Sequence, residues 1–106
     1  MTNLTDANFP KEIGQSKGVA LVDFFATWCG PCKIISPIVD ELSHDFSAKA
    51  TFGKIDVDEN QTTAMQFQVM SIPTLIFYKD GKEIDRVIGA VSKDSLKQKL
   101  EQHLGQ

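Results

Sequence analysis

The hydrophobic pattern of this chain changes abruptly within the stretch Val22-Asp23-Phe24-Phe25-Ala26-Thr27-Trp28-Cys29-Gly30-Pro31-Cys32-Lys33. The run from Val19 to Ala26 is rich in β-branched and aromatic residues and almost continuously apolar, which predicts a strand covered on both faces. Pro31 then stands where the first turn of a helix accepts proline. Apolar residues follow at helical spacing, namely Ile35, Ile38, Val39, Leu42 and Phe46. The stretch therefore predicts a buried strand that leads directly into a helix.

The same two patterns alternate along the rest of the chain. They predict strands over 51–57, 74–78 and 83–88, and further helices that begin near Asp6, Gln61 and Ser92. Asp6 is expected to cap the first of these helices, and Ser92 the last. The segment Lys79-Asp80-Gly81-Lys82 predicts a hairpin between the last two strands. Alternating strands and helices that end in a hairpin and a helix favour an α/β fold with a mixed sheet.

The composition is that of a single globular domain spanning residues 1–106. Hydrophobic residues make up 42% and charged residues 24%, which argues against a disordered chain, collagen or a coiled coil. Fourteen acidic and eleven basic residues give a net charge of −3, so no basic patch for nucleic acid or anionic membranes is expected. No apolar run approaches the ~20 residues that span a bilayer, and no signal peptide is visible. We therefore expect a cytoplasmic protein.

Cys29 and Cys32 are the only cysteines, and their spacing suits a structural crosslink poorly. Closing a loop of about four residues removes roughly 2 kcal/mol of unfolded-state entropy, against about 3 kcal/mol for fifteen residues. At a helix start, unpaired amides and the positive end of the dipole favour the Cys29 thiolate, which is the attacking species. Cys32 lies one turn further in and is expected to be the more buried. A redox pair is favoured; a zinc half-site completed by a second chain and an inert pair are the alternatives.

Asp23 interrupts the apolar strand, where an unpaired charge would cost several kcal/mol. Burial is expected to raise its pKa and to suit it to proton transfer. A structural ion pair is the alternative.

Two further signals are rejected as metal sites. The segment Asp56-Val57-Asp58-Glu59-Asn60 begins like a calcium loop, but Gln61 and Phe67 stand where glycine and a bidentate glutamate are required. We expect a solvated loop and a helix cap there. His44 and His103 have polar neighbours and are expected to be exposed.

The quoted stretch resembles the active-site segment of the thioredoxin family, and the resemblance covers essentially the whole chain. Chain length, element order, the segment Ser71-Ile72-Pro73-Thr74 and Gly89 before the last helix all fit. The resemblance implies a thioredoxin fold, with a central mixed five-stranded sheet flanked by four helices. It also implies an enzyme, a protein-disulfide reductase and electron carrier that works by dithiol–disulfide exchange through Cys29 and Cys32. The Gly-Pro dipeptide between the cysteines is similar to that of reducing thioredoxins.

The resemblance also implies roles for individual residues. Asp23, with Lys54 beside it, would transfer a proton to and from Cys32; a surface position for Lys54 is the alternative. The Ile72–Pro73 bond would be cis and face the cysteines, where the backbone would pair with an extended client segment. An apolar docking surface would be formed by Trp28, Gly30, Pro31, Ile72, Pro73, Gly89 and Val91. A place in the core is the alternative for Trp28.

No bound cofactor or metal is implied, because the redox group would be the Cys29–Cys32 disulfide and NADPH would act through thioredoxin reductase. The implied partners of this monomer are that reductase and clients such as ribonucleotide reductase, peroxiredoxin and methionine sulfoxide reductase. A scaffold module and an oxidising or isomerising variant remain as other hypotheses. Phe25 and Met70-Ser71 depart from the commonest family pattern, which bears on partner choice.

Overall fold

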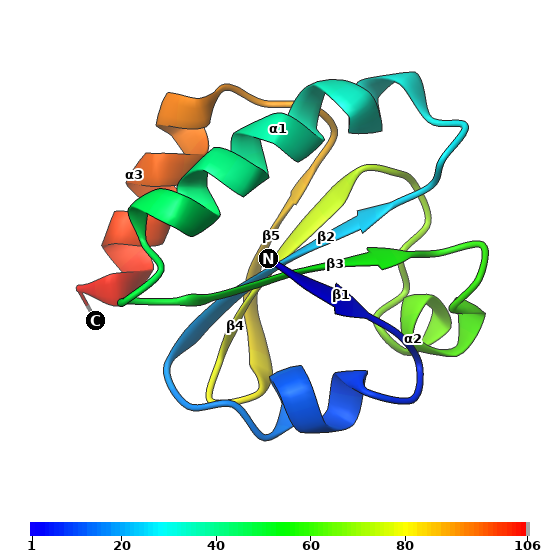
Figure 1. The fold of residues 1–106 in the computed structure, drawn as a ribbon, viewed down its shortest axis with the longest axis horizontal. Coiled ribbons are helices and arrows are strands. Elements are labelled where there is room, and N and C mark those ends of the chain that lie inside the picture. The colour runs from blue at the N-terminus through cyan, green and yellow to red at the C-terminus, as the bar shows by residue number, and fades with distance from the viewer. Residues whose placement is uncertain (106) are drawn as a thin grey trace.

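The computed structural model describes residues 1–105 and arranges them in three layers about one sheet (Figure 1). The strands are β1 (Thr2–Leu4), β2 (Val19–Phe25), β3 (Thr51–Asp56), β4 (Thr74–Lys79) and β5 (Lys82–Ile88). The helices are η1 (Pro10–Gly14, of the π type), α1 (Gly30–Asp45), α2 (Gln61–Gln66) and α3 (Lys93–Leu104). The expected mixed five-stranded sheet with four helices is thus confirmed.

The sheet has the strand order β1-β3-β2-β4-β5, so β2 lies at its centre. Strands β1 and β2 run parallel to β3, whereas β4 is antiparallel to both β2 and β5. Every residue from Ala20 to Phe24 is fully buried, as its continuous apolar run predicted. Because β2 and β3 are parallel, their carboxyl ends meet at one edge of the sheet, where the chain enters α1.

Alternation along β2 sends its side chains into two separate cores. Val19 and Leu21 pack in the core beneath α1 and α3, while Val22 and Phe24 pack in the core on the side of η1 and α2. Asp23 is two residues after Leu21, so its side chain lies on the same face of the strand as that of Leu21. Its carboxyl group therefore points to the α1 side of the sheet.

The N-terminal segment differs from expectation in two respects. The sequence pattern indicated no strand over Thr2–Leu4, because three residues carry too little periodicity; pairing with β3 forms it. Asp6 does not cap the helix that follows it. Its Oδ1 instead accepts hydrogen bonds from the Thr63 amide (2.8 Å) and the Thr63 hydroxyl (2.7 Å), so it caps α2 across 57 residues of sequence.

The hairpin and the last helix cap are confirmed. Asp80 and Gly81 both have positive φ, 52° and 83°, as a two-residue hairpin turn requires. A side chain at Gly81 would overlap the carbonyl group of Gly14, so only glycine fits there. At the start of α3, the Ser92 hydroxyl accepts a hydrogen bond from the Ser95 amide (3.1 Å).

The two histidines have opposite environments. His44 is exposed as expected, but the expectation for His103 is wrong because its side chain is buried. Its Nε2 lies 2.9 Å from Asp85 Oδ2, and its ring packs on Phe77. The polar neighbours of His103 misled the prediction, since His103 continues the buried helical stripe of Leu96 and Leu100.

No helix within residues 1–105 combines the length and apolarity needed to cross a membrane.

Candidate redox site

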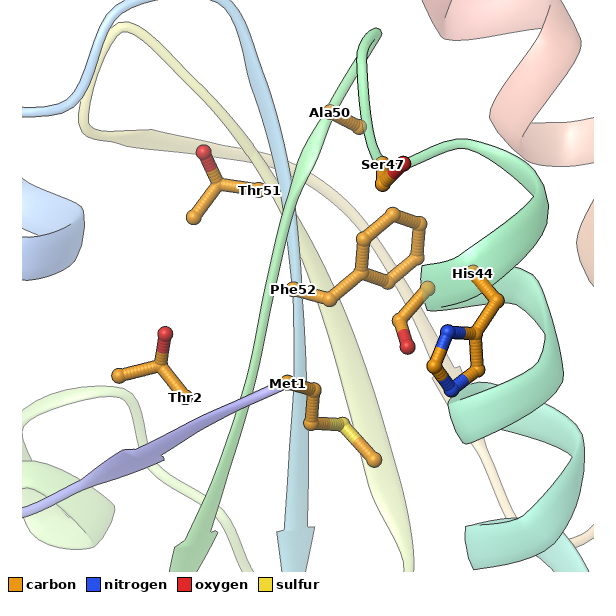
Figure 2. A pocket seen from close by; sticks show the side chains of 8 residues that line it. Met1, Thr2, His44, Ser47, Ala50, Thr51 and Phe52 are labelled. Carbon is orange, nitrogen blue, oxygen red and sulfur yellow. The ribbon is translucent and has the colours of Figure 1, made fainter.

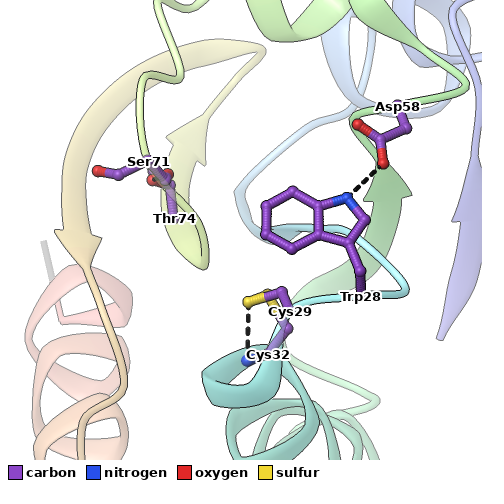
Figure 3. Close-up of a disulfide and its surroundings, with 6 residues drawn as sticks. All are labelled: Trp28, Cys29, Cys32, Asp58, Ser71 and Thr74. Carbon is purple, nitrogen blue, oxygen red and sulfur yellow. Dashed lines mark hydrogen bonds between the residues drawn. A yellow bond between two sulfur atoms is a disulfide. The ribbon is translucent and has the colours of Figure 1, made fainter.

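The sulfur atoms of Cys29 and Cys32 form a disulfide at the start of α1 (Figure 3). Cys29 is the N-cap residue with extended backbone, and its Sγ accepts a hydrogen bond from the Cys32 amide (3.2 Å). The predicted junction and the proximity of Cys29 to the helix amides are thereby confirmed. Both sulfurs are engaged in this bond, and residues 1–105 contain no cluster of three or more side chains suited to a metal ion.

The two cysteines are almost equally buried in this oxidised state, so the expected difference is in the predicted direction but very small. Cys29 is 4% exposed and Cys32 is 3% exposed. Both pack with Ala26, and Phe25 and Ile72 lie against the same cluster. The strand end and the loop before β4 enclose the pair together, so position along the helix alone did not determine its burial.

Trp28 lies beside the disulfide with its indole ring 69% exposed, so the alternative of a core position is wrong. Its Nε1 donates a hydrogen bond of 2.7 Å to Asp58 Oδ2 in the loop after β3 (Figure 3). This contact orients an apolar ring that remains open to solvent. Asp58 was not singled out as a site residue, because its partner is thirty positions away in the sequence.

Asp23 is fully buried, and within the described residues neither carboxylate oxygen has a hydrogen-bond partner. Burial raises the pKa of Asp23 to about 7, and the positive charge of Lys54 opposes this increase. The carboxyl group can therefore gain or lose a proton near neutral pH. The alternative of a structural ion pair is not formed, since no ion pair involves Asp23 among residues 1–105.

Lys54 lies directly across from Asp23 in the pairing of β2 with β3. Residues opposite each other in paired strands face the same side of the sheet, so both point toward α1. The side chain is half-buried, and its Nζ lies 6.0 Å from the centroid of the Phe25 ring. The structure thus places Lys54 next to Asp23 and close to the cysteine cluster.

The Ile72–Pro73 bond is cis, which confirms that expectation. Ile72 is half-buried and packs against the cysteine cluster, and Figure 3 shows the loop from Ser71 to Thr74 across from the disulfide. The Pro73 carbonyl accepts a hydrogen bond from the Gly89 amide (2.8 Å), and Gly89 has a φ of 93°. This bond ties the end of β5 to the loop before β4.

The residues expected to form a docking surface differ widely in exposure. Gly30 and Pro31 are exposed like Trp28, Gly89 is half-buried, and Pro73 is buried. Val91 is half-buried against the core beneath α1 and α3. Three further exposed apolar side chains were not assigned to this surface: Ile34, Met70 and Ile88. Ile88 pairs with Thr74 and is therefore adjacent to the loop.

A separate hollow of about 380 Å³ lies near the other end of α1 (Figure 2). Its walls include Met1, His44 and Phe52. His44 is fifteen positions beyond Cys29, roughly 20 Å along a helix axis. This hollow is therefore not part of the cysteine site.

Comparison with known proteins agrees with this geometry. The family model Thioredoxin matches residues 1–102. Proteins named thioredoxin from Staphylococcus haemolyticus and Staphylococcus saprophyticus are each 52% identical to this chain over 104 residues, and one from Staphylococcus aureus is 50% identical. Each alignment covers 98% of both chains. The chain therefore belongs to the thioredoxin family of thiol–disulfide oxidoreductases.

Proposed function

We propose that this protein reduces disulfides in client proteins, with Cys29 as the attacking thiol and Cys32 as the resolving thiol. The observation that carries the proposal is the disulfide at the first turn of α1, with Cys29 Sγ accepting the Cys32 amide. A helix N-terminus stabilises negative charge on sulfur, so Cys29 is the better thiolate of the pair. The chain is a thiol–disulfide oxidoreductase, and this geometry supports the proposed assignment of the two roles.

The reaction is a pair of exchanges that conserves electrons. The Cys29 thiolate attacks one sulfur of a client disulfide, a Cys29–client disulfide forms, and the other client sulfur leaves as a thiolate. Cys32 then loses its proton and attacks Cys29 Sγ. The Cys29–Cys32 disulfide forms and the second client thiolate leaves. The client has gained two electrons, and its two thiolates take up two protons from solvent, which balance those that Cys29 and Cys32 lost.

Asp23 and Lys54 are proposed to serve the second exchange. A carboxyl group with a pKa of about 7 can accept the Cys32 proton at neutral pH and release it afterwards. Lys54 opposes the effect of burial and so keeps this pKa from rising further. Both residues face α1, the helix that carries Cys32.

Clients are proposed to dock on the apolar surface around the disulfide. An extended client segment would pair with the backbone near Ile72, in the manner of an added strand. The surface consists of Trp28, Gly30, Pro31, Ile72, Pro73, Gly89 and Val91. The exposure of Trp28 and the contact of Ile72 with the cysteine cluster support this arrangement.

The remaining assignments follow the family. We propose a single domain over residues 1–106 that acts as a monomer in the cytoplasm. The reducing environment of that compartment returns the cysteine pair to its dithiol form. Thioredoxin reductase would return electrons from NADPH to the Cys29–Cys32 disulfide. Ribonucleotide reductase, peroxiredoxin and methionine sulfoxide reductase are the proposed clients.

The direction of electron flow is tested by the reduction potential of the pair against glutathione. A reductase has a potential below that of the glutathione couple, so the protein should reduce oxidised glutathione. A potential above that couple would instead support an oxidising or isomerising enzyme. Reduction of insulin disulfides by the wild-type protein tests the scaffold hypothesis, because a scaffold module would show no turnover.

A further inference from the structure

Two hollows along α1 share a wall formed by Lys33 and Ser36. The smaller, of about 230 Å³, is also lined by Cys32 and Phe25. The larger, of about 500 Å³, also has Lys54 on its wall. The two hollows are therefore neighbours along α1, and together they are called the crevice: Cys32 lines one of them, and Lys54, the lysine beside Asp23, lines the other.

Ser36 lies on α1 one turn after Cys32. Residues four positions apart share a face of a helix, and helical side chains lean toward the N-terminus, so the Ser36 hydroxyl points toward the turn of Cys32. Ser36 is half-buried, and its hydroxyl has no hydrogen-bond partner among residues 1–105. A serine within a helix commonly bonds to the carbonyl four residues earlier. Here both its donor and its acceptor are free to bind water.

Asp23 needs a carrier to exchange a proton with Cys32 or with solvent. Within the part of the chain that the structure describes, neither of its oxygens has a hydrogen-bond partner or is accessible to solvent. Lys54 lies across from it on β3 and lines the larger hollow, so the crevice extends to the residue beside Asp23. On β4, the residue opposite Asp23 is the apolar Leu75. The other charged side chains on the crevice walls are Lys33 and Asp40, and the N-terminal residue Met1 also lines the larger hollow.

We propose that Ser36 is a positioning residue for proton transfer between Cys32 and Asp23, because its hydroxyl holds the crevice water that carries the proton. In this step the Cys32 thiol gives its proton to that water, which passes a proton to the Asp23 carboxylate. The Cys32 thiolate then attacks Cys29 Sγ. Protonated Asp23 later returns the proton to solvent along the same crevice. This inference rests on the roles proposed above for Cys32 and Asp23.

The test separates the two exchanges in the reduced protein. Dithiobis(nitrobenzoate) is a symmetrical disulfide that releases one coloured thiolate when Cys29 attacks and a second when Cys32 resolves the mixed disulfide. Stopped-flow absorbance across a pH series measures both phases. Ser36→Ala is expected to slow only the second phase, by about two- to tenfold, the range that one neutral hydrogen bond supports. The pH at which the rate of the second phase is half of its maximum should also increase in this variant.

Two further variants control for structural effects. Ser36→Thr retains the hydroxyl and should restore the second phase. Ser43→Ala removes a different hydroxyl from the same helix about two turns away, one that donates a hydrogen bond to the Asp40 carbonyl and lies outside the crevice, and both phases should match the wild type. Alanine favours the helix, so loss of folding is not expected for either alanine variant.

The possible failures can be told apart. The role of Ser36 is overturned if Ser36→Ala has the wild-type second phase while Asp23→Asn is slowed, and in that case the proposed function stands. It is also overturned if Ser36→Thr is as slow as Ser36→Ala. If Asp23→Asn shows the wild-type pH profile as well, the proton-transfer role of Asp23 fails together with that of Ser36.

Discussion

Two carboxylates on the strands of this sheet have opposite environments. Asp23, at the centre of β2, has no partner among the described residues, and burial raises its pKa to about 7. Asp85, on β5, is also partly desolvated, which by itself would raise its pKa. Hydrogen bonds from His103, Lys99 and the Arg86 amide outweigh that effect and hold the pKa of Asp85 below its usual value.

The difference separates a carboxylate that stabilises the fold from one suited to chemistry. The ionised form of Asp85 joins α3 to β5 through His103 and Lys99. The ionised form of Asp23 opposes folding. A rise from 3.8 to about 7 corresponds to about 4 kcal/mol lost once the pH exceeds 7. A buried ionisable group that destabilises the fold in this way is typical of a site where the group exchanges protons.

The largest expected effect is the loss of activity in Cys29→Ser. Without the attacking sulfur no client disulfide can be opened, so reduction of insulin disulfides should stop. Cys32→Ser should instead accumulate mixed disulfides, which non-reducing electrophoresis detects. Full turnover by Cys29→Ser would contradict the proposed function.

Asp23→Asn is expected to have opposite effects on activity and stability. Turnover near neutral pH should decrease by about tenfold or more, because a proton acceptor is lost. The free energy of unfolding should increase by up to about 4 kcal/mol above pH 7, since no buried charge must form. The gain should disappear as the pH falls from 7 toward 3.8, where the wild-type carboxyl group becomes protonated in the folded protein.

Urea unfolding at a series of pH values measures this second effect. An Asp23→Asn protein whose stability keeps a constant offset from the wild type at all pH values would show that burial of Asp23 does not raise its pKa. An unchanged pH–rate profile would remove Asp23 from the mechanism.

Asp85→Asn should lower stability by about 1–3 kcal/mol at neutral pH, because His103 and Lys99 lose a charged partner. The pKa of Asp85 is lowered by folding, so its contribution is present above pH 3.8 and is lost as the pH falls through the folded-state pKa. Insulin reduction should be unchanged. Glu101→Gln, on the exposed side of α3, is the control. A loss of activity without a loss of stability would contradict this division of roles.

The smallest effect is expected for Asp6→Ala, which removes the half-buried side chain that caps α2. The midpoint of thermal unfolding should decrease, but less than for Asp85→Asn, because water can replace the lost hydrogen bonds to Thr63. Asp6→Asn keeps an acceptor oxygen and should lie close to the wild type. A larger decrease for Asp6→Ala than for Asp85→Asn would show that the hydrogen bonds of Asp85 to Lys99 and His103 stabilise the fold less than the neutral ones of Asp6 to Thr63.

The features that depend on neighbouring residues were predictable. The strand before Cys29, the helix after it, the turn at Asp80 and Gly81, and the Ser92 cap each follow from local periodicity or turn chemistry. The cysteine spacing likewise pointed to redox chemistry. These predictions held because a few adjacent residues determine their conformation.

The features that failed or were missed depend on distant partners. Asp6 caps a helix more than fifty positions away. His103 is buried because its ring bonds to Asp85 and packs on Phe77. The Asp58 contact to Trp28 also joins separate loops. Polar side chains such as these satisfy their hydrogen bonds wherever the fold offers a partner, which the local sequence does not encode.

The sequence by itself determined that a cysteine pair stands where a buried strand meets a helix, with an aspartate in that strand. Backbone propensity and hydrophobic period act over a few residues, so they suffice for this much. Only the tertiary structure decided that Asp23 has no hydrogen-bond partner among residues 1–105, and that Lys54 faces it. It also decided that Ser36 lines hollows with both Lys54 and Cys32, and that Trp28 stays exposed. Burial and electrostatics are sums over the whole packed chain, and the reactivity of this site depends on them.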